Sequence, residues 1–143
     1  MSRVVRLILP VVLAVLAAAA GWAGFAPIHA ETREQAFDIP RGTWARRRAG
    51  DLVEILPDHI RLTLGIKDVL LIRNHDEVPQ TFGPTIMMPG QSFRLPFERA
   101  ASYQFVCSAH ASGQLTIEVE PEPVMPWAKI HWRVREWWEN QKK

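Results

Sequence analysis

Cysteine is nearly absent from this chain, since Cys107 is the only one among 143 residues. A single cysteine excludes an internal disulfide, so an exported thiol is either buried and inert, bridged to another chain or bound to a metal. The chain also lacks internal repeats, a glycine-rich phosphate loop, a zinc-protease motif and a paired-carboxylate signature. We therefore expect that the chain is not an enzyme.

A net excess of one charge is also missing from most of the chain. The whole sequence carries +2, and the segment 1–30 holds two arginines but no acid, so the 17 basic residues fall to 15 beyond it and equal the 15 acidic ones. Residues 41–48 contain four arginines, a cluster that is more often a solvated face than a binding patch. The charge balance predicts no nucleic-acid partner.

The N-terminal segment is dominated by one apolar run. Arg3 and Arg6 precede 20 residues without a charge, 7–26. This is longer than the roughly 7–15-residue core of a secretory signal and close to the ~20 residues that cross a bilayer. Residues 1–30 are thus predicted to be a signal peptide, cleaved after Ala30, or a retained membrane anchor. Either one places the rest of the chain on the periplasmic or extracytoplasmic side, because the arginines stay in the cytoplasm.

The middle of the chain, residues 31–120, shows short apolar segments separated by turns. Their alternation and their spacing of roughly 8–12 residues are typical of strands in an antiparallel sandwich or barrel. Residues 45–57 are less regular and are predicted to be a loop or a short helix. We predict one all-β domain with strands over 36–40, 59–64, 68–74, 88–97, 102–107 and 114–120.

The end of the chain changes character again. Residues 121–126 hold three prolines and are predicted to be a stiff linker, and 127–143 are predicted to be an amphipathic helix. One face of that helix gathers Trp127, Ile130, Val134, Trp137 and Trp138. This face is suited to a membrane surface, to a groove on a partner protein, or to covering the sandwich.

One loop carries two side chains with metal-binding chemistry. Cys107 and His110 form a C-x2-H motif between two predicted strands, and a thiolate with an imidazole suits copper or zinc. Two ligands make a poor site, so we expect a partner from residues 73–83, where His75 and Gln80 are available. A nucleophilic Cys–His pair is disfavoured because no Asn or Asp that could orient the base follows in the loop.

The segment 70–119 resembles the core of a cupredoxin, the blue-copper β-sandwich family that includes plastocyanin and amicyanin. The likeness spans about residues 58–120 and lies in the order of an Asn–Pro turn, a Pro–Gly turn, a C-x2-H loop and a closing strand. The positions that carry it are Asn74, Pro79, Pro89, Gly90, Tyr103, Cys107, His110, Gly113 and Thr116. It implies a Greek-key β-sandwich that binds copper.

The resemblance also shows departures at the metal site. Cys107 and His110 match the family's thiolate and second imidazole, but Gln80 occupies the position of the first histidine and no methionine follows His110. A blue-copper centre is a trigonal His2Cys site with a weak axial ligand. The third ligand would have to be Gln80, His75, or Met87 or Met88. His59 and His131 have no partner in the pattern.

Two functions follow from this resemblance. The first is an exported, membrane-associated protein that binds copper through Cys107, His110 and Gln80 for one-electron transfer to a redox partner, or for copper handling. The second is a copper-free accessory or interaction subunit of a membrane protein complex, favoured by the substitution at Gln80 and the missing axial ligand.

Overall fold

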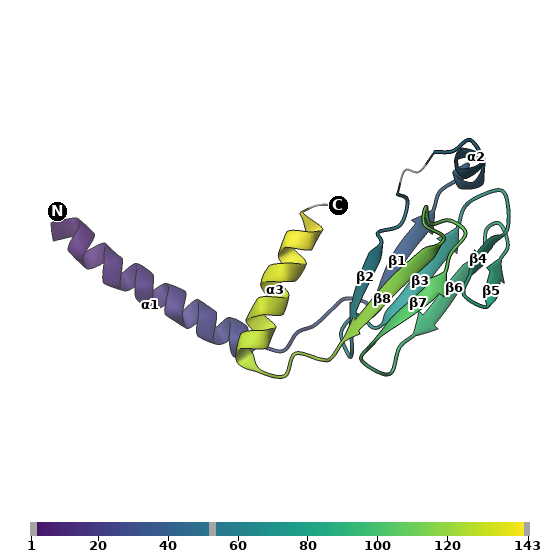
Figure 1. Ribbon diagram of the computed structural model, residues 1–143. Coiled ribbons are helices and arrows are strands. Elements are labelled where there is room, and N and C mark those ends of the chain that lie inside the picture. The colour runs from purple at the N-terminus through teal and green to yellow at the C-terminus, as the bar shows by residue number, and fades with distance from the viewer. Residues whose placement is uncertain (1–2, 52–53, 142–143) are drawn as a thin grey trace. The chain divides into compact units, whose positions relative to one another are not determined.

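The computed structural model describes residues 3–51 and 54–141, with side chains from residue 8 onward. The chain forms two compact units (Figure 1). Ala30–Glu122 is called the β domain below, and Met1–His29 together with Pro123–Lys143 is called the helical pair. Each unit is described by itself.

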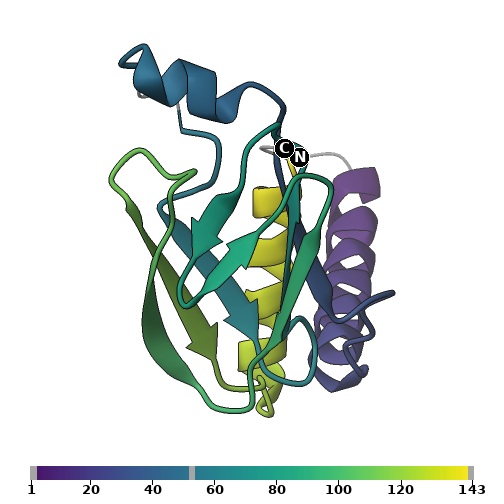
Figure 2. The same cartoon turned by 90° about the vertical axis from the view of Figure 1, so that its right-hand side faces the viewer.

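The β domain is built from two three-stranded sheets and a hairpin (Figures 1 and 2). The sheets have the orders β1-β3-β6 and β2-β8-β7, and β4 pairs with β5. In each larger sheet the central strand pairs in parallel with one neighbour and antiparallel with the other. The strands are β1 (Glu34–Ile39), β2 (His59–Thr63), β3 (Val69–Asn74), β4 (Gln80–Phe82), β5 (Thr85–Met87), β6 (Ser92–Pro96), β7 (Ala101–Val106) and β8 (Gln114–Glu120).

Two parts of the predicted fold class need correction. The sheets are mixed rather than antiparallel, because the long connections from β1 to β3 and from β2 to β8 allow these pairs to run in parallel. The chain is also not all-β, because three helices accompany the strands among the described residues. The Greek-key connection stays a prediction.

The core of the β domain follows from the strand pattern. Strand β8 alternates, with Leu115, Ile117 and Val119 buried and the residues between them more exposed. Strand β3 is buried almost throughout, as its continuous apolar run predicts. Phe82 joins the sheets through ring contacts with Phe93 (5.7 Å) and Phe105 (5.0 Å between centroids). Each fully buried Leu, Ile or Phe contributes roughly 1.5–3 kcal/mol.

A short helix, α2 (Thr43–Arg48), lies at one end of the β domain, where the loop from Cys107 to Gly113 also lies (Figures 1 and 2). Gly42 precedes it with φ +80°, a left-handed conformation that glycine adopts at little cost. In the turn after α2 the Asp51 N–H donates to the Arg46 carbonyl at 3.0 Å. Of the segment predicted as loop or short helix, residues 45–48 are therefore helical, and 52–53 lie outside the described residues.

The helical pair consists of α1 (Arg3–Phe25) and α3 (Pro126–Asn140). Residues 8–25 of α1 have a mean hydropathy of 2.2, and this is the one helix among the described residues that is long and apolar enough to cross a membrane. Length and composition do not separate an anchor from a signal sequence, because both meet this test so close to the N-terminus.

Helix α3 packs against the C-terminal end of α1. Arg133 donates to the carbonyl of Ala23, and to those of Ala26 (3.0 Å) and Pro27 (3.1 Å). Gly24 eases this close approach, since a Cβ there would lie 3.1 Å from the Pro126 Cβ, a tight contact. The predicted apolar face of α3 is mostly exposed, with relative accessibilities of 72% for Trp127, 56% for Trp137 and 58% for Trp138.

Candidate metal centre

The C-x2-H loop is a tight turn closed by backbone hydrogen bonds. Cys107 donates its N–H to Gly113 (2.9 Å), His110 to Cys107 (3.3 Å) and Gly113 to His110 (3.1 Å). Gly113 has φ +75°, which explains the glycine before β8. Cys107 also forms a β-bridge with Phe82 at the end of β4. The strands therefore hold Cys107 and His110 in one loop, as the sequence predicts.

Arg47 of α2 fastens this loop from outside. Its guanidinium donates to the Ala109 carbonyl from Nε (3.3 Å) and Nη2 (3.0 Å), and to the Asp51 carbonyl from Nη1 (2.9 Å). The arginine cluster was predicted to be a solvated face. Three of its members are exposed, as predicted, whereas Arg47 is half-buried and ties α2 to the residue before His110.

Gln80, the residue at the position of the family's first histidine ligand, is buried, and both the oxygen and the nitrogen of its amide form a hydrogen bond. Its Nε2 donates to Asp76 Oδ2 (2.9 Å), and its Oε1 accepts from Ser108 Oγ (2.6 Å). Because an ionised carboxylate only accepts, the amide NH2 must face Asp76, which places Oε1 toward Ser108. Ser108 also accepts the Thr81 N–H at 2.8 Å. The amide thus joins β4 to the C-x2-H loop.

Asp76 is the centre of this network. Besides Gln80, its carboxylate accepts N–H groups of Gly42 (2.9 Å), Trp44 (2.8 Å) and Glu77 (2.9 Å). Burial is the largest single influence on its pKa and raises it. The hydrogen bonds from Trp44, Glu77, Gly42 and Gln80 together outweigh burial and lower the pKa of Asp76 below its ordinary value. Asp76 therefore stays a carboxylate and binds the start of α2 to the β3–β4 loop.

Asn74 stabilises the β3–β4 loop through its side-chain amide. Its Nδ2 donates to the carbonyls of Val78 (3.0 Å) and Met87 (2.9 Å), and its Oδ1 accepts the Asp76 N–H at 3.0 Å. The position that carries the Asn–Pro turn of the resemblance is thus a buried structural residue.

Cys107 lies within the hydrophobic core rather than at an open surface. Its relative accessibility is 1%, and it packs in the cluster that contains Phe82, Met87 and Leu115. Burial raises the pKa of the Cys107 thiol. The nearby N–H groups of Ala109 and His110 and the charge of Arg47 act in the opposite direction but are weaker. The thiol form is therefore favoured, although a copper ligand must be a thiolate.

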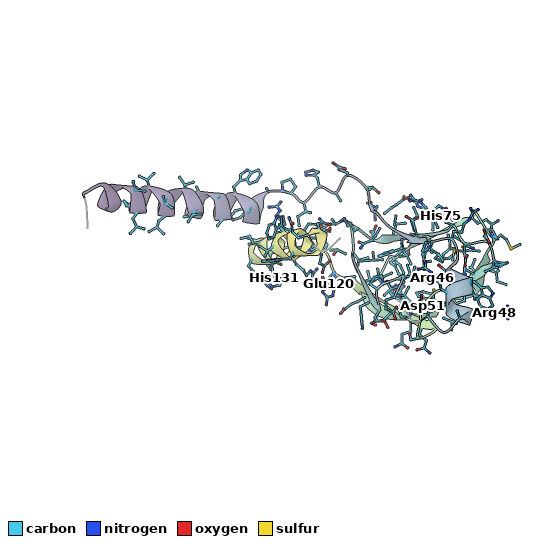
Figure 3. All side chains as sticks on the ribbon, turned by 90° about the horizontal axis from the view of Figure 1, so that it is seen from above. Arg46, Arg48, Asp51, His75, Glu120 and His131 are labelled. Carbon is cyan, nitrogen blue, oxygen red and sulfur yellow. The ribbon has the colours of Figure 1, made fainter. Side chains whose placement is uncertain are left out.

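The other residues considered as a third ligand are His75, Met87 and Met88. His75 is exposed, and its Nε2 lies 3.2 Å from Asp38 Oδ1 (Figure 3). Met87 is buried in the core cluster, whereas Met88 is half exposed. His59 and His131 are exposed, in keeping with the absence of a partner for either in the pattern.

These observations test the fit of a blue-copper ion. Its trigonal site needs a second equatorial nitrogen beside Cys107 and His110, and the side chain in that place is an amide whose oxygen and nitrogen both have partners. The described residues therefore do not fit a His2Cys copper centre without breaking the Asp76–Gln80–Ser108 network.

The Nε2 atom of His110 faces Glu54 and Asp58, and this part of the site is called the outer side below, in contrast to the inner side formed by Asp76, Gln80 and Ser108. The imidazole is buried, with 1% of its side chain accessible, and Nδ1 lies 2.9 Å from Ser112 Oγ. Nε2 lies 3.2 Å from Glu54 Oε2 and 3.1 Å from Asp58 Oδ1, yet neither contact has the geometry of a hydrogen bond. Among residues 3–51 and 54–141, only these three have ligand atoms of His, Cys, Asp or Glu grouped closely enough for an ion, within 4.8 Å.

Several residues that contact Gln80 or His110 at this end of the domain were not predicted from the sequence. Asp76 and Ser108 lie within the two segments that the resemblance singles out, so their polar side chains beside Gln80 and Cys107 were the available signal. Glu54 and Asp58 are far from His110 in sequence, and Asp58 is brought near it because it leads into β2, whose neighbour is β8.

Comparison with known proteins gives matches among solved structures alone. No protein-family description and no curated protein matches the chain. Among solved structures, a purple cupredoxin from Nitrosopumilus maritimus is 20% identical with a TM-score of 0.45, covering 59% of this chain and 98% of that one. Amicyanin from Paracoccus versutus is 16% identical with a TM-score of 0.42, covering 68% and 88%. At these values the likeness assigns no metal, partner or activity to this chain.

Proposed function

We propose that the chain is a non-enzymatic accessory domain, cupredoxin-like in fold, which is held at the outer face of a membrane and does not assemble a blue-copper centre. The observation that carries this proposal is the Gln80 amide, which is hydrogen-bonded at both ends, to Asp76 and to Ser108. A metal ligand drawn from this buried network would leave its hydrogen-bond partners unpaired, which costs stability.

The helical pair supports the membrane part of the proposal. Helix α1 has the length and apolar composition of a membrane span. Helix α3 is bound to the end of α1 through Arg133 and leaves Trp127, Trp137 and Trp138 exposed. Tryptophan favours the interface between headgroups and acyl chains. Such a pair suits an anchor with an interfacial helix beside it, on the extracytoplasmic side, next to a membrane protein complex as partner.

Copper binding for electron transfer or copper handling is the second candidate function. It is favoured by the loop that holds Cys107 and His110 together through the backbone bonds of Cys107, His110 and Gly113. For this function Gln80 would have to release Ser108 or Asp76, and the buried thiol would have to lose its proton. The structural cost of these changes places copper second.

A copper titration of the full chain in detergent separates the two functions. Wild type, Cys107→Ala and Gln80→His would be followed by the thiolate-to-copper charge-transfer band. We expect no band for wild type and a band for Gln80→His, because histidine restores the nitrogen that a trigonal site needs. A wild-type band that disappears with Cys107→Ala would overturn the accessory function and establish copper binding.

A further inference from the structure

The outer side of the C-x2-H loop offers a second set of ligands that shares only His110 with the family's copper site. We infer that Glu54, Asp58 and the Nε2 atom of His110 form a binding site for a divalent transition-metal ion of the zinc class. This goes beyond the accessory function, which concerns the inner side of the loop.

The first step is the state of the imidazole. Nδ1 lies 2.9 Å from Ser112 Oγ, and that hydroxyl donates to the Gln114 carbonyl at 3.0 Å. When the hydroxyl proton is directed to Gln114, Ser112 Oγ accepts from Nδ1 and the lone pair of the ring lies on Nε2. In the other tautomer, Nδ1 accepts the Ser112 N–H at 3.3 Å and Nε2 carries the proton. A metal ion at Nε2 requires the first tautomer, which the hydroxyl of Ser112 accommodates.

The second step is what faces that lone pair. Nε2 is buried and makes no hydrogen bond, while one carboxylate oxygen from each of Glu54 and Asp58 lies within 3.2 Å. A lone pair and two carboxylates repel one another unless a cation lies among them. The cation is either a proton on Nε2 or a metal ion. A proton would be expected to form a hydrogen bond to one of the acids, and neither contact has that geometry.

The third step concerns the distances between the ligand atoms. Zinc binds histidine nitrogen and carboxylate oxygen at about 2.0–2.2 Å, so ligand atoms at angles of about 90–110° lie roughly 2.8–3.6 Å apart. The separations of Nε2 from Asp58 Oδ1 (3.1 Å) and from Glu54 Oε2 (3.2 Å) lie in this range. Two of the three separations therefore match those between ligands of one zinc ion, and all three ligand atoms lie within 4.8 Å of one another.

The surroundings fix the ligands and leave the ion accessible. Ser112 orients the ring through Nδ1, as second-sphere partners of metal-bound histidines commonly do. The Asp58 carbonyl accepts the Thr116 N–H at 3.2 Å, which ties this residue to β8. The carboxylates are solvent-accessible, 45% for the Glu54 side chain and 72% for that of Asp58. One nitrogen and two oxygens with an open position suit zinc and its neighbours rather than a soft Cu(I) ion.

Zinc titration calorimetry on the full chain in detergent tests the site. We expect one Zn²⁺ per chain, bound at least tenfold more weakly by Glu54→Gln and by Asp58→Asn. Both changes affect accessible side chains, so the fold should persist, and far-UV circular dichroism would verify this. Ser112→Ala should weaken binding by about 10- to 100-fold, because it loosens the ring without removing a ligand.

Asp38→Asn is the matched control, since Asp38 lies beside His75 in an exposed pair without a second carboxylate at the imidazole. Its zinc affinity should equal that of wild type, as should that of Cys107→Ala. Absence of zinc binding by wild type, or equal affinity in wild type and the Glu54→Gln and Asp58→Asn variants, would overturn the site. In those cases Nε2 carries a proton and the three residues form an ion pair only.

Discussion

The two sides of the C-x2-H loop differ in how their polar atoms are satisfied. On the inner side, Gln80 has partners for both atoms of its amide, and Asp76 accepts four hydrogen bonds. On the outer side, the Nε2 atom of His110 is buried without a hydrogen bond and faces two accessible carboxylates. The difference teaches that Gln80, at one ligand position of the resemblance, belongs to a hydrogen-bonded network, whereas His110, at another, has a nitrogen that lacks a hydrogen bond among the described residues.

Asp76→Ala should lower the free energy of unfolding more than any other change to the inner side. This change removes one acceptor from four donors, two of which are the N–H groups at the start of α2. We expect the free energy of unfolding to fall by about 3 kcal/mol or more, since hydrogen bonds to charged groups are worth roughly 1.5–3 kcal/mol each and do not add fully. Urea unfolding of the full chain in detergent would measure it.

Asp38→Ala serves as the control because Asp38 is exposed and lies next to His75 and Arg73. Its effect should be about 0.5 kcal/mol or less. If both variants lose the same small amount, the Asp76 network does not hold this end of the domain together.

Ser108→Ala should have a smaller effect. It leaves Gln80 Oε1 without its donor and the Thr81 N–H without its acceptor. We expect a loss of about 1–2 kcal/mol in the same unfolding measurement. Ser102→Ala on the exposed part of β7 should change stability by about 0.5 kcal/mol at most. A neutral Ser108→Ala would mean that Gln80 is free to serve as a ligand.

The dependence of stability on pH also tests the network around Asp76. Asp76 has a lowered pKa in the folded state, so its contribution is fully present above the unfolded value near 3.9 and is lost as the pH falls through the lower folded value. The free energy of unfolding should therefore decline below about pH 4. Asp68, whose pKa is lowered chiefly by the hydrogen bond from Arg33, has the same sign.

Unfolding measured between pH 7 and pH 3 should show a shallower decline for Asp76→Asn than for wild type, because this variant keeps only the Asp68 part. Identical slopes in wild type and Asp76→Asn would show that the Asp76 carboxylate is not stabilised in the fold.

Much of the architecture could be predicted because it depends on periodic patterns. The alternation of β8 and the continuous apolar run of β3 correspond to strands with those burial patterns, and the Trp-rich segment forms a helix. The parallel pairs were missed, since residue periodicity is the same for a strand in either direction.

The candidate site was less accessible to sequence reasoning. The placement of Cys107 and His110 in one loop depends on local spacing and could be predicted. The partners of Gln80 depend on a contact between residues 28 positions apart, and those of His110 on contacts with Glu54 and Asp58 across two strands. Such contacts depend on the tertiary fold, for which a single sequence has no periodic signal.

X-ray absorption at the zinc edge, on the full chain loaded with one equivalent of Zn²⁺, tests the central claim most directly. The claim is that metal binds on the outer side of the loop through His110, Glu54 and Asp58, and not through Cys107. The account predicts nitrogen and oxygen scatterers alone, at about 2.0–2.2 Å from the ion. A sulfur scatterer at about 2.3 Å would contradict it, because Cys107 is the only cysteine of the chain and would then be a ligand.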